Sequence, residues 1–311
     1  MRVFRGVPKR AIDSVALTIG NFDGIHLGHQ AMLTRLIEVA RARGLPAAVM
    51  TFEPHPREFF TPAAAPTRLT SLREKLELLL IAGIDRVYVC RFNRTFSQIA
   101  ADEFVTRILR DGLAVKWLLV GDDFRFGAKR VGEYALLQRH APFAGFELCA
   151  LESVESGGKR VSSTLVREAL AAGDMDLAAS YLARPYSISG RVMHGDKIGR
   201  TLGFPTANVR FRHNRPPVAG IFAVKFHVAD GPTLNGVASL GTRPTVTAHG
   251  GFRLEVHVFN FSGDLYGRHV RVDFLMKLRD EAHYPDLETM TAQIARDAQD
   301  ARRFFDLPLR D

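Results

Sequence analysis

The fold of this chain is decided by residues Val15–His29, which read VALTIGNFDGIHLGH. The first five residues are apolar or β-branched, which predicts a fully buried strand. The remaining ten form a glycine-rich turn, and one helix face then follows in Leu33, Leu36 and Ala40. A buried strand that passes through a tight turn into a helix predicts a β–α–β arrangement and therefore a parallel sheet.

Strands and helices keep alternating as far as residue 151. We predict four more buried strands, at Ala47–Phe52, Arg86–Cys90, Val115–Gly121 and Phe146–Leu151. Helical stretches between them end near Ile81 and Leu109. This alternation is typical of a doubly wound parallel sheet with helices on both faces. Ligands of such sheets bind beyond the carboxyl ends of the strands, so we expect the chemistry in the loops after Ile19, Phe52 and Val120.

The pattern changes after two further helical stretches, Ser163–Ala172 and Asp174–Leu182. Short alternating segments follow, separated by glycine and proline, and they predict an antiparallel barrel or sandwich. These strands are Ser187–His194, Ile221–Val228, Leu234–Leu240, Arg253–Phe259 and His269–Met276. An amphipathic helix from Leu287 to Ala301 ends the chain. We therefore expect an α/β plus β protein with two domains, residues 1–183 and 184–311.

The composition fits a soluble globular protein, with 311 residues, 46% hydrophobic and 24% charged. The net charge of +9 suits nucleotides, phosphorylated small molecules or nucleic acid, although many basic surfaces are merely solvated. Cys90 and Cys149 lie in apolar strands, so we expect core residues and neither a disulfide framework nor a zinc site. No stretch resembles a signal peptide or a membrane span, which predicts a cytoplasmic protein.

The turn at Gly20–His29 has the features of a phosphate site. Its glycines let backbone N–H groups approach phosphates at the start of a helix, but it matches neither the P-loop nor the dinucleotide fingerprint. His26 and His29 are three residues apart, so we expect both imidazoles on one face of the first helical turn. Capping or packed histidines are the alternative, and a metal site is less favoured because no third ligand is nearby in sequence.

Four elements in this order resemble the bacterial riboflavin kinase/FMN adenylyltransferase family, whose N-terminal half is similar to the nucleotidyltransferases. They are the HxGH element in Gly20–His29, FEPHP at Phe52–Pro56, GDDFRFG at Gly121–Gly127 and VSSTLVR at Val161–Arg167. Each follows a predicted strand or begins a predicted helix. A chance match of all four is therefore improbable, although no single element is decisive.

The resemblance assigns roles to residues of the N-terminal half. It implies catalysis by His26, His29 and Arg167. It implies binding of ATP and phosphate by Gly20, Phe22, Asp23, Gly24, Gly28, Ser163 and Thr164. It implies flavin binding by His55, Pro56, Asp123, Phe124, Arg125 and Phe126. From the residues alone, Phe124 and Phe126 are equally well core aromatics, and Ser163 is equally well an N-cap.

A second dense stretch, His194–Asn208, reads HGDKIGRTLGFPTAN. Its glycines allow close backbone approach, and its basic residues provide charge for an anion. Thr206 and Asn208 are two residues apart, so on an extended segment their oxygens face one side, as binding of nucleotide-bound Mg²⁺ requires. A long barrel loop is the alternative.

The stretch resembles the flavokinase motif, which implies Mg²⁺ ligands in Thr206 and Asn208. The same motif implies ATP contacts from Gly195, Lys197, Gly199 and Arg200. Downstream, GVASLGTRPT at Gly236–Thr245 and EVHVF at Glu255–Phe259 also match, and they imply that Glu255 is the general base. A surface glutamate is the alternative. Arg279 matches a position near the flavin, whereas Ser239 and Asn260 depart from the common pattern.

The resemblance implies two reactions with ATP as co-substrate and Mg²⁺ as cofactor. Riboflavin would be phosphorylated to FMN in the C-terminal half, and FMN would be adenylylated to FAD in the N-terminal half. A chain with only one working half is the first alternative. A nucleic-acid-binding protein is the second, but the basic residues are spread along the chain without an aromatic–basic ladder. No membrane partner is expected.

Overall fold

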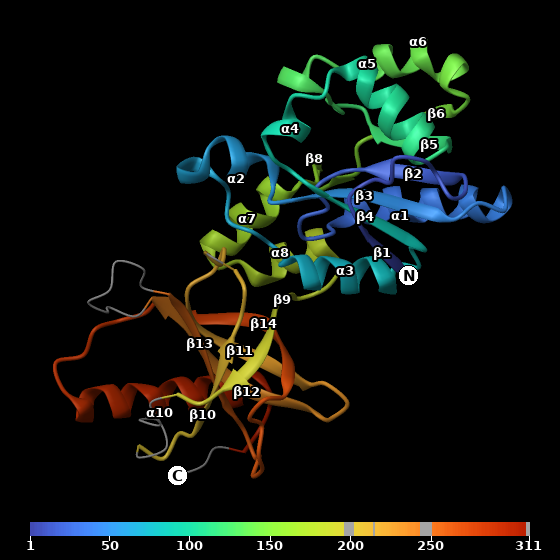
Figure 1. Cartoon of the computed structure of the whole chain (residues 1–311). Coiled ribbons are helices and arrows are strands. Elements are labelled where there is room, and N and C mark those ends of the chain that lie inside the picture. The colour runs from blue at the N-terminus through green and yellow to red at the C-terminus, as the bar shows by residue number, and fades with distance from the viewer. Residues whose placement is uncertain (196–201, 214, 243–250, 309–311) are drawn as a thin grey trace. The chain divides into compact units, whose positions relative to one another are not determined.

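The computed structural model describes residues 1–195, 202–213, 215–242 and 251–308. It divides into two compact units, drawn in Figure 1. The first comprises Met1–Pro66 and Leu72–Ser162, and the second comprises Thr67–Ser71 and Ser163–Asp311. The chain therefore leaves the first unit briefly at Thr67–Ser71 and finally after residue 162.

The first unit is built on a six-stranded sheet in which every strand pair is parallel, as predicted. The order is β1-β4-β3-β2-β5-β6. The strands are β1 (Arg2–Arg5), β2 (Val15–Ile19), β3 (Ala47–Glu53), β4 (Arg86–Arg91), β5 (Val115–Gly121) and β6 (Glu147–Leu151). The sequence did not predict β1, because this edge strand carries arginines at both ends and lacks a buried run.

Both faces of this sheet are covered, which explains why its central strand β2 is buried throughout. Along β2, Val15, Leu17 and Ile19 pack into one hydrophobic cluster, while Ala16 packs into the other. The second cluster is closed by α1 (Leu27–Ala42) and α3 (Leu72–Ile81). The first is closed by a π-helical segment, η2 (Phe104–Gly112), which continues α5 (Ala101–Glu103), and by α6 (Tyr134–Ala144).

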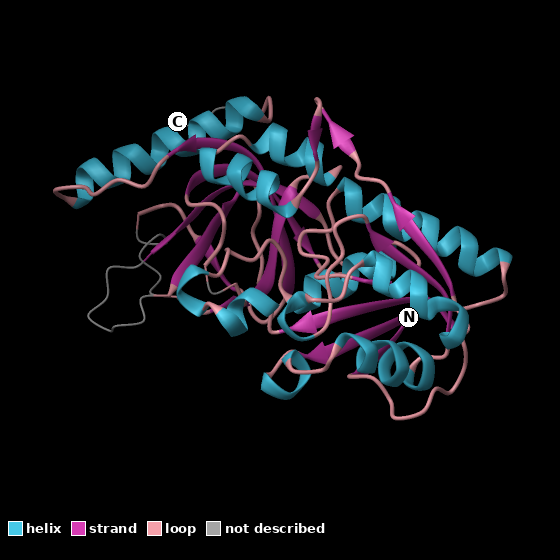
Figure 2. Cartoon of the chain, turned by 90° about the horizontal axis from the view of Figure 1, so that it is seen from above, coloured by secondary structure: helices cyan, strands magenta, loops and turns pink. Residues whose placement is uncertain are grey.

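The strand order places a topological switch at β2. From β2 the chain moves outward through β3 and β4, then crosses back to β5 on the other side of β2. Loops that leave β2 and β5 therefore diverge at neighbouring carboxyl ends, where α/β sheets bind their ligands. Gly20–His29 and Gly121–Gly127 are these two loops. Figure 2 shows the strands and the helices that cover them.

The second unit contains a closed antiparallel barrel, and the predicted barrel is thus confirmed over the sandwich. Its strands are β9 (Tyr186–Met193), β10 (Thr206–Arg210), β11 (Gly220–Val228), β12 (Thr233–Thr242), β13 (Phe252–Val258) and β14 (His269–Arg279), in the order β10-β13-β12-β11-β14-β9. Helices α7 (Ser163–Ala172) and α8 (Met175–Leu182) precede it. The terminal helix α10 (Leu287–Phe304) packs Ala298 and Ala301 against the barrel core.

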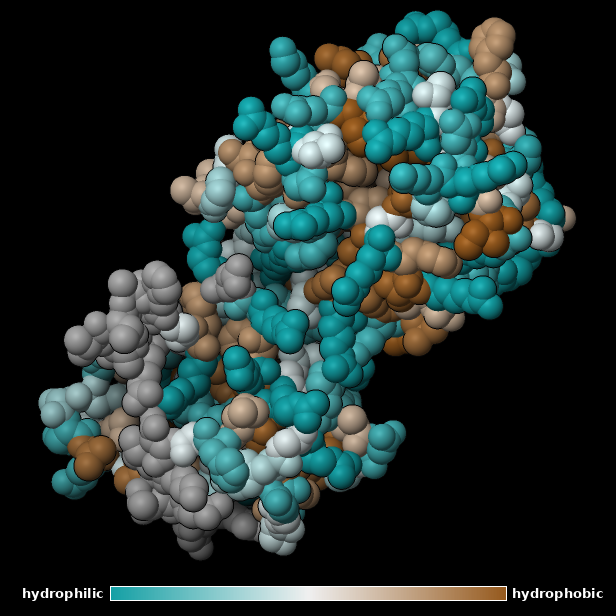
Figure 3. Space-filling view, in the orientation of Figure 1, coloured by the Kyte–Doolittle hydropathy of each residue, from teal (hydrophilic) through white to brown (hydrophobic). Residues whose placement is uncertain are grey.

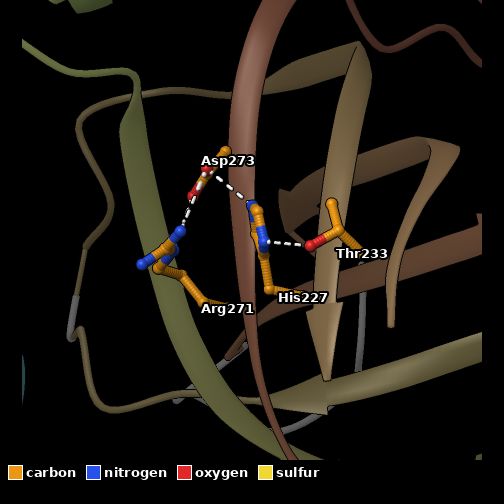
Figure 4. A network of polar contacts seen from close by, with 4 residues as sticks. All are labelled: His227, Thr233, Arg271 and Asp273. Atoms are coloured by element: carbon orange, nitrogen blue, oxygen red, sulfur yellow. Dashed lines mark hydrogen bonds and ion pairs between the residues drawn. The ribbon is translucent and has the colours of Figure 1, made fainter. Parts of the chain in front are cut away.

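A polar network ties three barrel strands together, as Figure 4 shows. His227 on β11 contacts Asp273 on β14 through Nε2 at 2.8 Å and Thr233 on β12 through Nδ1 at 2.9 Å. Arg271 donates to the other Asp273 oxygen at 2.9 Å. Asp273 is 8% exposed, so this network satisfies a nearly buried acidic residue.

Shorter elements complete the first unit: α2 (Pro56–Phe60), η1 (Pro62–Ala64), α4 (Arg94–Ser97), η3 (Ala128–Arg130), β7 (Glu155–Ser156) and β8 (Lys159–Arg160). Both cysteines are free. Cys90 is buried as predicted, and burial raises the pKa of its thiol to about 12, whereas Cys149 is only half-buried on β6.

The face drawn in Figure 3 is mostly hydrophilic, with scattered apolar residues. Within the described ranges, no helix combines the length and apolarity that spanning a bilayer demands.

Candidate active sites

The turn after β2 has an unusual backbone. Phe22 and Ile25 have φ angles of 49° and 41°, and Gly24 has 82°. Non-glycine residues with positive φ are strained, and such strain is concentrated at ligand sites. The Phe22 ring is fully buried in the sheet core, and a Cβ at Gly20 would lie 3.1 Å from it. Phe22 can therefore offer a nucleotide its backbone N–H but not its ring.

His26 and His29 lie together at the start of α1. His26 is the N-cap of the helix rather than a residue of its first turn, and the two rings stack at a centroid distance of 3.8 Å. Gly28 permits this arrangement, because a Cβ there would lie 3.2 Å from the His26 ring. The predicted pairing is thus confirmed, and both side chains sit where helix N–H groups favour an anion.

His29 is held in its neutral form. Burial lowers its pKa well below the ordinary 6.5, and the positive charges of His26 and Lys75 lower it further. At pH 7 the ring can therefore donate one hydrogen bond to a phosphate oxygen, but it brings no charge. Among the described residues, His29 Nδ1 and Asn21 Oδ1 are buried side-chain atoms without a hydrogen-bond partner. These two atoms are available to a ligand.

Lys75 belongs to this site and was missed in the sequence. It lies on α3, is 4% exposed, and its Nζ is 3.5 Å from Thr51 Oγ1 at the carboxyl end of β3. The Thr51 hydroxyl donates in turn to the Asn21 carbonyl at 3.2 Å. A lysine in an amphipathic helix is normally solvated, so only tertiary packing reveals that this one is buried.

His55 and Pro56 form the N-terminus of α2, just after β3. His55 Nδ1 accepts a hydrogen bond from the Arg57 N–H at 3.1 Å, and Glu58 accepts one from the His55 N–H at 3.1 Å. This is a capping box with Pro56 at the first helical position. The expected flavin residues thus build a rigid loop at the predicted sheet edge.

The loop after β5 mixes packed and charged side chains. Phe126 is buried in the core, and its ring is stacked on Phe124 at 5.6 Å. Phe124 is the less buried of the two, so its ring is the more accessible. Arg125 pairs with Glu133, and Asp123 pairs with Arg160 at 2.9 Å. Both charged residues are therefore engaged with protein partners in this structure.

Three further predicted residues lie in the second unit. Ser163 and Thr164 begin α7, as expected. Arg167 donates through Nε to the Thr67 carbonyl at 2.5 Å. This bond joins α7 to the segment Thr67–Ser71 within the second unit.

The barrel places its predicted residues in a row. Asn208 on β10 and Ser239 on β12 are the register partners of Glu255 on either side. Thr206 lies on the same face of β10 as Asn208, since Ala207 between them is buried. A Cβ at Gly195 would lie 2.3 Å from the Asn208 amide, so glycine is needed there. The predicted orientation of Glu255, away from buried Val256, is confirmed.

Two arginines near this row differ from expectation. Arg253 donates to Glu255 Oε1 at 2.7 Å, a contact that strand alternation allowed but that we did not predict. Arg279, expected near the flavin, makes two hydrogen bonds to Asp297 of α10, at 2.7 and 2.6 Å. Its guanidinium therefore joins β14 to the terminal helix. The predicted ATP residues Lys197, Gly199 and Arg200 lie outside the described residues.

Known proteins match both halves of the chain. The FAD synthetase family profile matches residues 9–165, and the riboflavin kinase profile matches residues 182–305. The chain belongs to the bifunctional riboflavin kinase/FMN adenylyltransferase family. The Escherichia coli K12 member is 48% identical over 99% of both chains. The Pseudomonas fluorescens member is 50% identical over 92% of this chain and 91% of its own.

A solved structure supports the same fold over the full length. It is described as a macrolide-efflux protein from Streptococcus pneumoniae, and it matches with a TM-score of 0.82 at 27% identity. The match covers 97% of this chain and 99% of that one. The family resemblance found in the sequence is thus confirmed, and the transferase class follows from both profiles.

Proposed function

We propose that this chain converts riboflavin to FMN and then FMN to FAD, with ATP as the second substrate of both steps. The kinase step is assigned to residues 184–311 and the adenylyl step to residues 1–183. The observation that carries the proposal is the pairing of two different sites in one chain. One is a stacked imidazole pair at a sheet switch point, and the other is a carboxylate opposite an amide on barrel strands.

In the kinase step, the 5′-hydroxyl oxygen of riboflavin attacks the γ-phosphorus of ATP. The new O–P bond forms while the bond from the γ-phosphorus to the β,γ-bridging oxygen breaks, and ADP leaves. Glu255 accepts the hydroxyl proton. Its register partner Asn208 and the nearby Thr206 present oxygen atoms to one side, which fits a Mg²⁺ ion that takes most of its ligands from phosphates and water. When bound, Mg²⁺ neutralises phosphate charge.

In the adenylyl step, a phosphate oxygen of FMN attacks the α-phosphorus of ATP, and pyrophosphate leaves. The attacking phosphate is already ionised at pH 7, so no general base is needed. His29 donates a hydrogen bond, and the strained turn offers backbone N–H groups, which together stabilise the charge that develops on the phosphates. We assign Ser163, Thr164 and Arg167 to phosphate binding, and His55, Pro56 and the loop Asp123–Phe126 to the flavin.

A time course tests the proposal directly. Purified protein is incubated with riboflavin, ATP and Mg²⁺, and the flavins are separated by chromatography. We expect FMN to rise first and FAD to follow. Accumulation of FMN alone would limit the function to the kinase, and absence of any conversion by folded protein would overturn both assignments.

A further inference from the structure

Lys75 lies directly beneath the phosphate-binding turn. It is one of only two charged residues among the buried positions of α3, and the other is Glu74. Two hydrogen bonds link it to the turn, from its ammonium to the Thr51 hydroxyl and from that hydroxyl to the Asn21 carbonyl. Moving an ammonium group out of water costs roughly several kcal/mol before new interactions in the protein offset it. The burial of Lys75 at this position therefore calls for an explanation.

The adenylyl step creates a need for positive charge at this turn. ATP and FMN are both anions, and their phosphates must approach each other. His29 is neutral, so its hydrogen bond cannot balance that charge. A fixed ammonium in the weakly polarisable interior acts over a longer range than one in water. Lys75 meets this requirement, since its charge already reaches the His29 ring.

We propose that Lys75 is a positioning residue for adenylyl transfer, which supplies from beneath the turn a fixed positive charge that His29 lacks. It acts through the Thr51–Asn21 bridge and through His29, without touching the substrates. This inference rests on the proposed function of the N-terminal half. It adds to the expected phosphate-binding set a residue from a helix that contains none of the motifs.

The test compares Lys75→Met, which keeps the aliphatic length but removes the charge, with Lys75→Arg. We expect Lys75→Met to lower kcat for FMN adenylylation by about 10- to 100-fold, and Lys75→Arg to restore most of it. Riboflavin phosphorylation by the same molecules is the internal control. Arg73→Met is the matched control, because Arg73 lies on the same helix but is exposed and pairs with Glu77 at the surface.

A second measurement separates charge from packing. Titration of the His29 imidazole by NMR should show a higher pKa in Lys75→Met than in the wild type, because one of its two positive neighbours has gone while burial and His26 remain. An unchanged titration overturns the proposal. So does full adenylylation by folded Lys75→Met, or equal loss in both lysine variants. If the wild type makes FMN but no FAD, the adenylyl assignment fails, and the titration still decides whether Lys75 acts on His29.

Discussion

The two proposed sites differ in the chemistry that they offer to ATP. At the turn after β2, His29 is neutral and stacks on buried His26 beside a strained backbone. On the barrel, Glu255 is partly exposed and held on a regular ladder between Ser239 and Asn208. The attacking groups explain the difference. A hydroxyl must lose a proton, so its site presents a carboxylate, whereas an ionised phosphate needs only donors and charge.

Glu255→Gln tests the proposed general base on the barrel. The amide keeps the shape but cannot take the hydroxyl proton, so we expect kinase kcat to fall by about 10³-fold. Conversion of added FMN to FAD should continue at the wild-type rate. Steady-state rates with riboflavin and with FMN measure both. Loss of both activities in a folded variant would contradict the assignment of separate sites.

His29→Ala tests the proposed phosphate donor at the turn after β2. Removal of a phosphate donor from a preorganised site typically costs about 10²-fold in kcat, and here the stacking partner of His26 is lost as well. Riboflavin phosphorylation should be unaffected. Since His29 stays neutral, wild-type adenylylation should show no change due to this group between pH 6.5 and 8. A step in the pH profile that disappears in His29→Ala would show that its protonated form takes part.

Features that depend on local sequence could be predicted, whereas those that depend on tertiary packing could not. The run of apolar and β-branched residues at Val15–Ile19 and the spacing of His26 and His29 are local features, so the sheet and the imidazole pair were both predictable. The burial of Lys75 depends on how α3 packs against β3, which periodicity does not report. Arg125 meets Glu133 across a loop of irregular backbone, and no rule of spacing gives that pair. By contrast, Arg253 and Glu255 lie two residues apart on one strand, so alternation alone places them on the same face.

Asp273→Asn tests whether the barrel can be destabilised separately from the first unit. It weakens the hydrogen bonds from His227 and Arg271 to a nearly buried carboxylate, which should lower the free energy of unfolding of the barrel by about 2 kcal/mol. Kinase activity should therefore be lost on heating at a lower temperature than adenylylation. Asp300→Asn is the control, because its pair with Arg303 is solvent-exposed. Equal thermal sensitivity of the two activities would show that the units unfold together.

Arg253→Gln has the smallest expected effect and addresses how the barrel holds its base. Arg253 engages one carboxylate oxygen of Glu255 at 2.7 Å and leaves the other for the substrate hydroxyl. Without it, Glu255 regains rotamer freedom that costs about 1 kcal/mol to remove, so kinase kcat should fall about fivefold with little change in KM. Arg253→Lys should recover part of this loss, because it retains one donor and the charge. An effect confined to KM would instead place Arg253 in substrate binding. Glu255 would then act as the base without a partner to orient it.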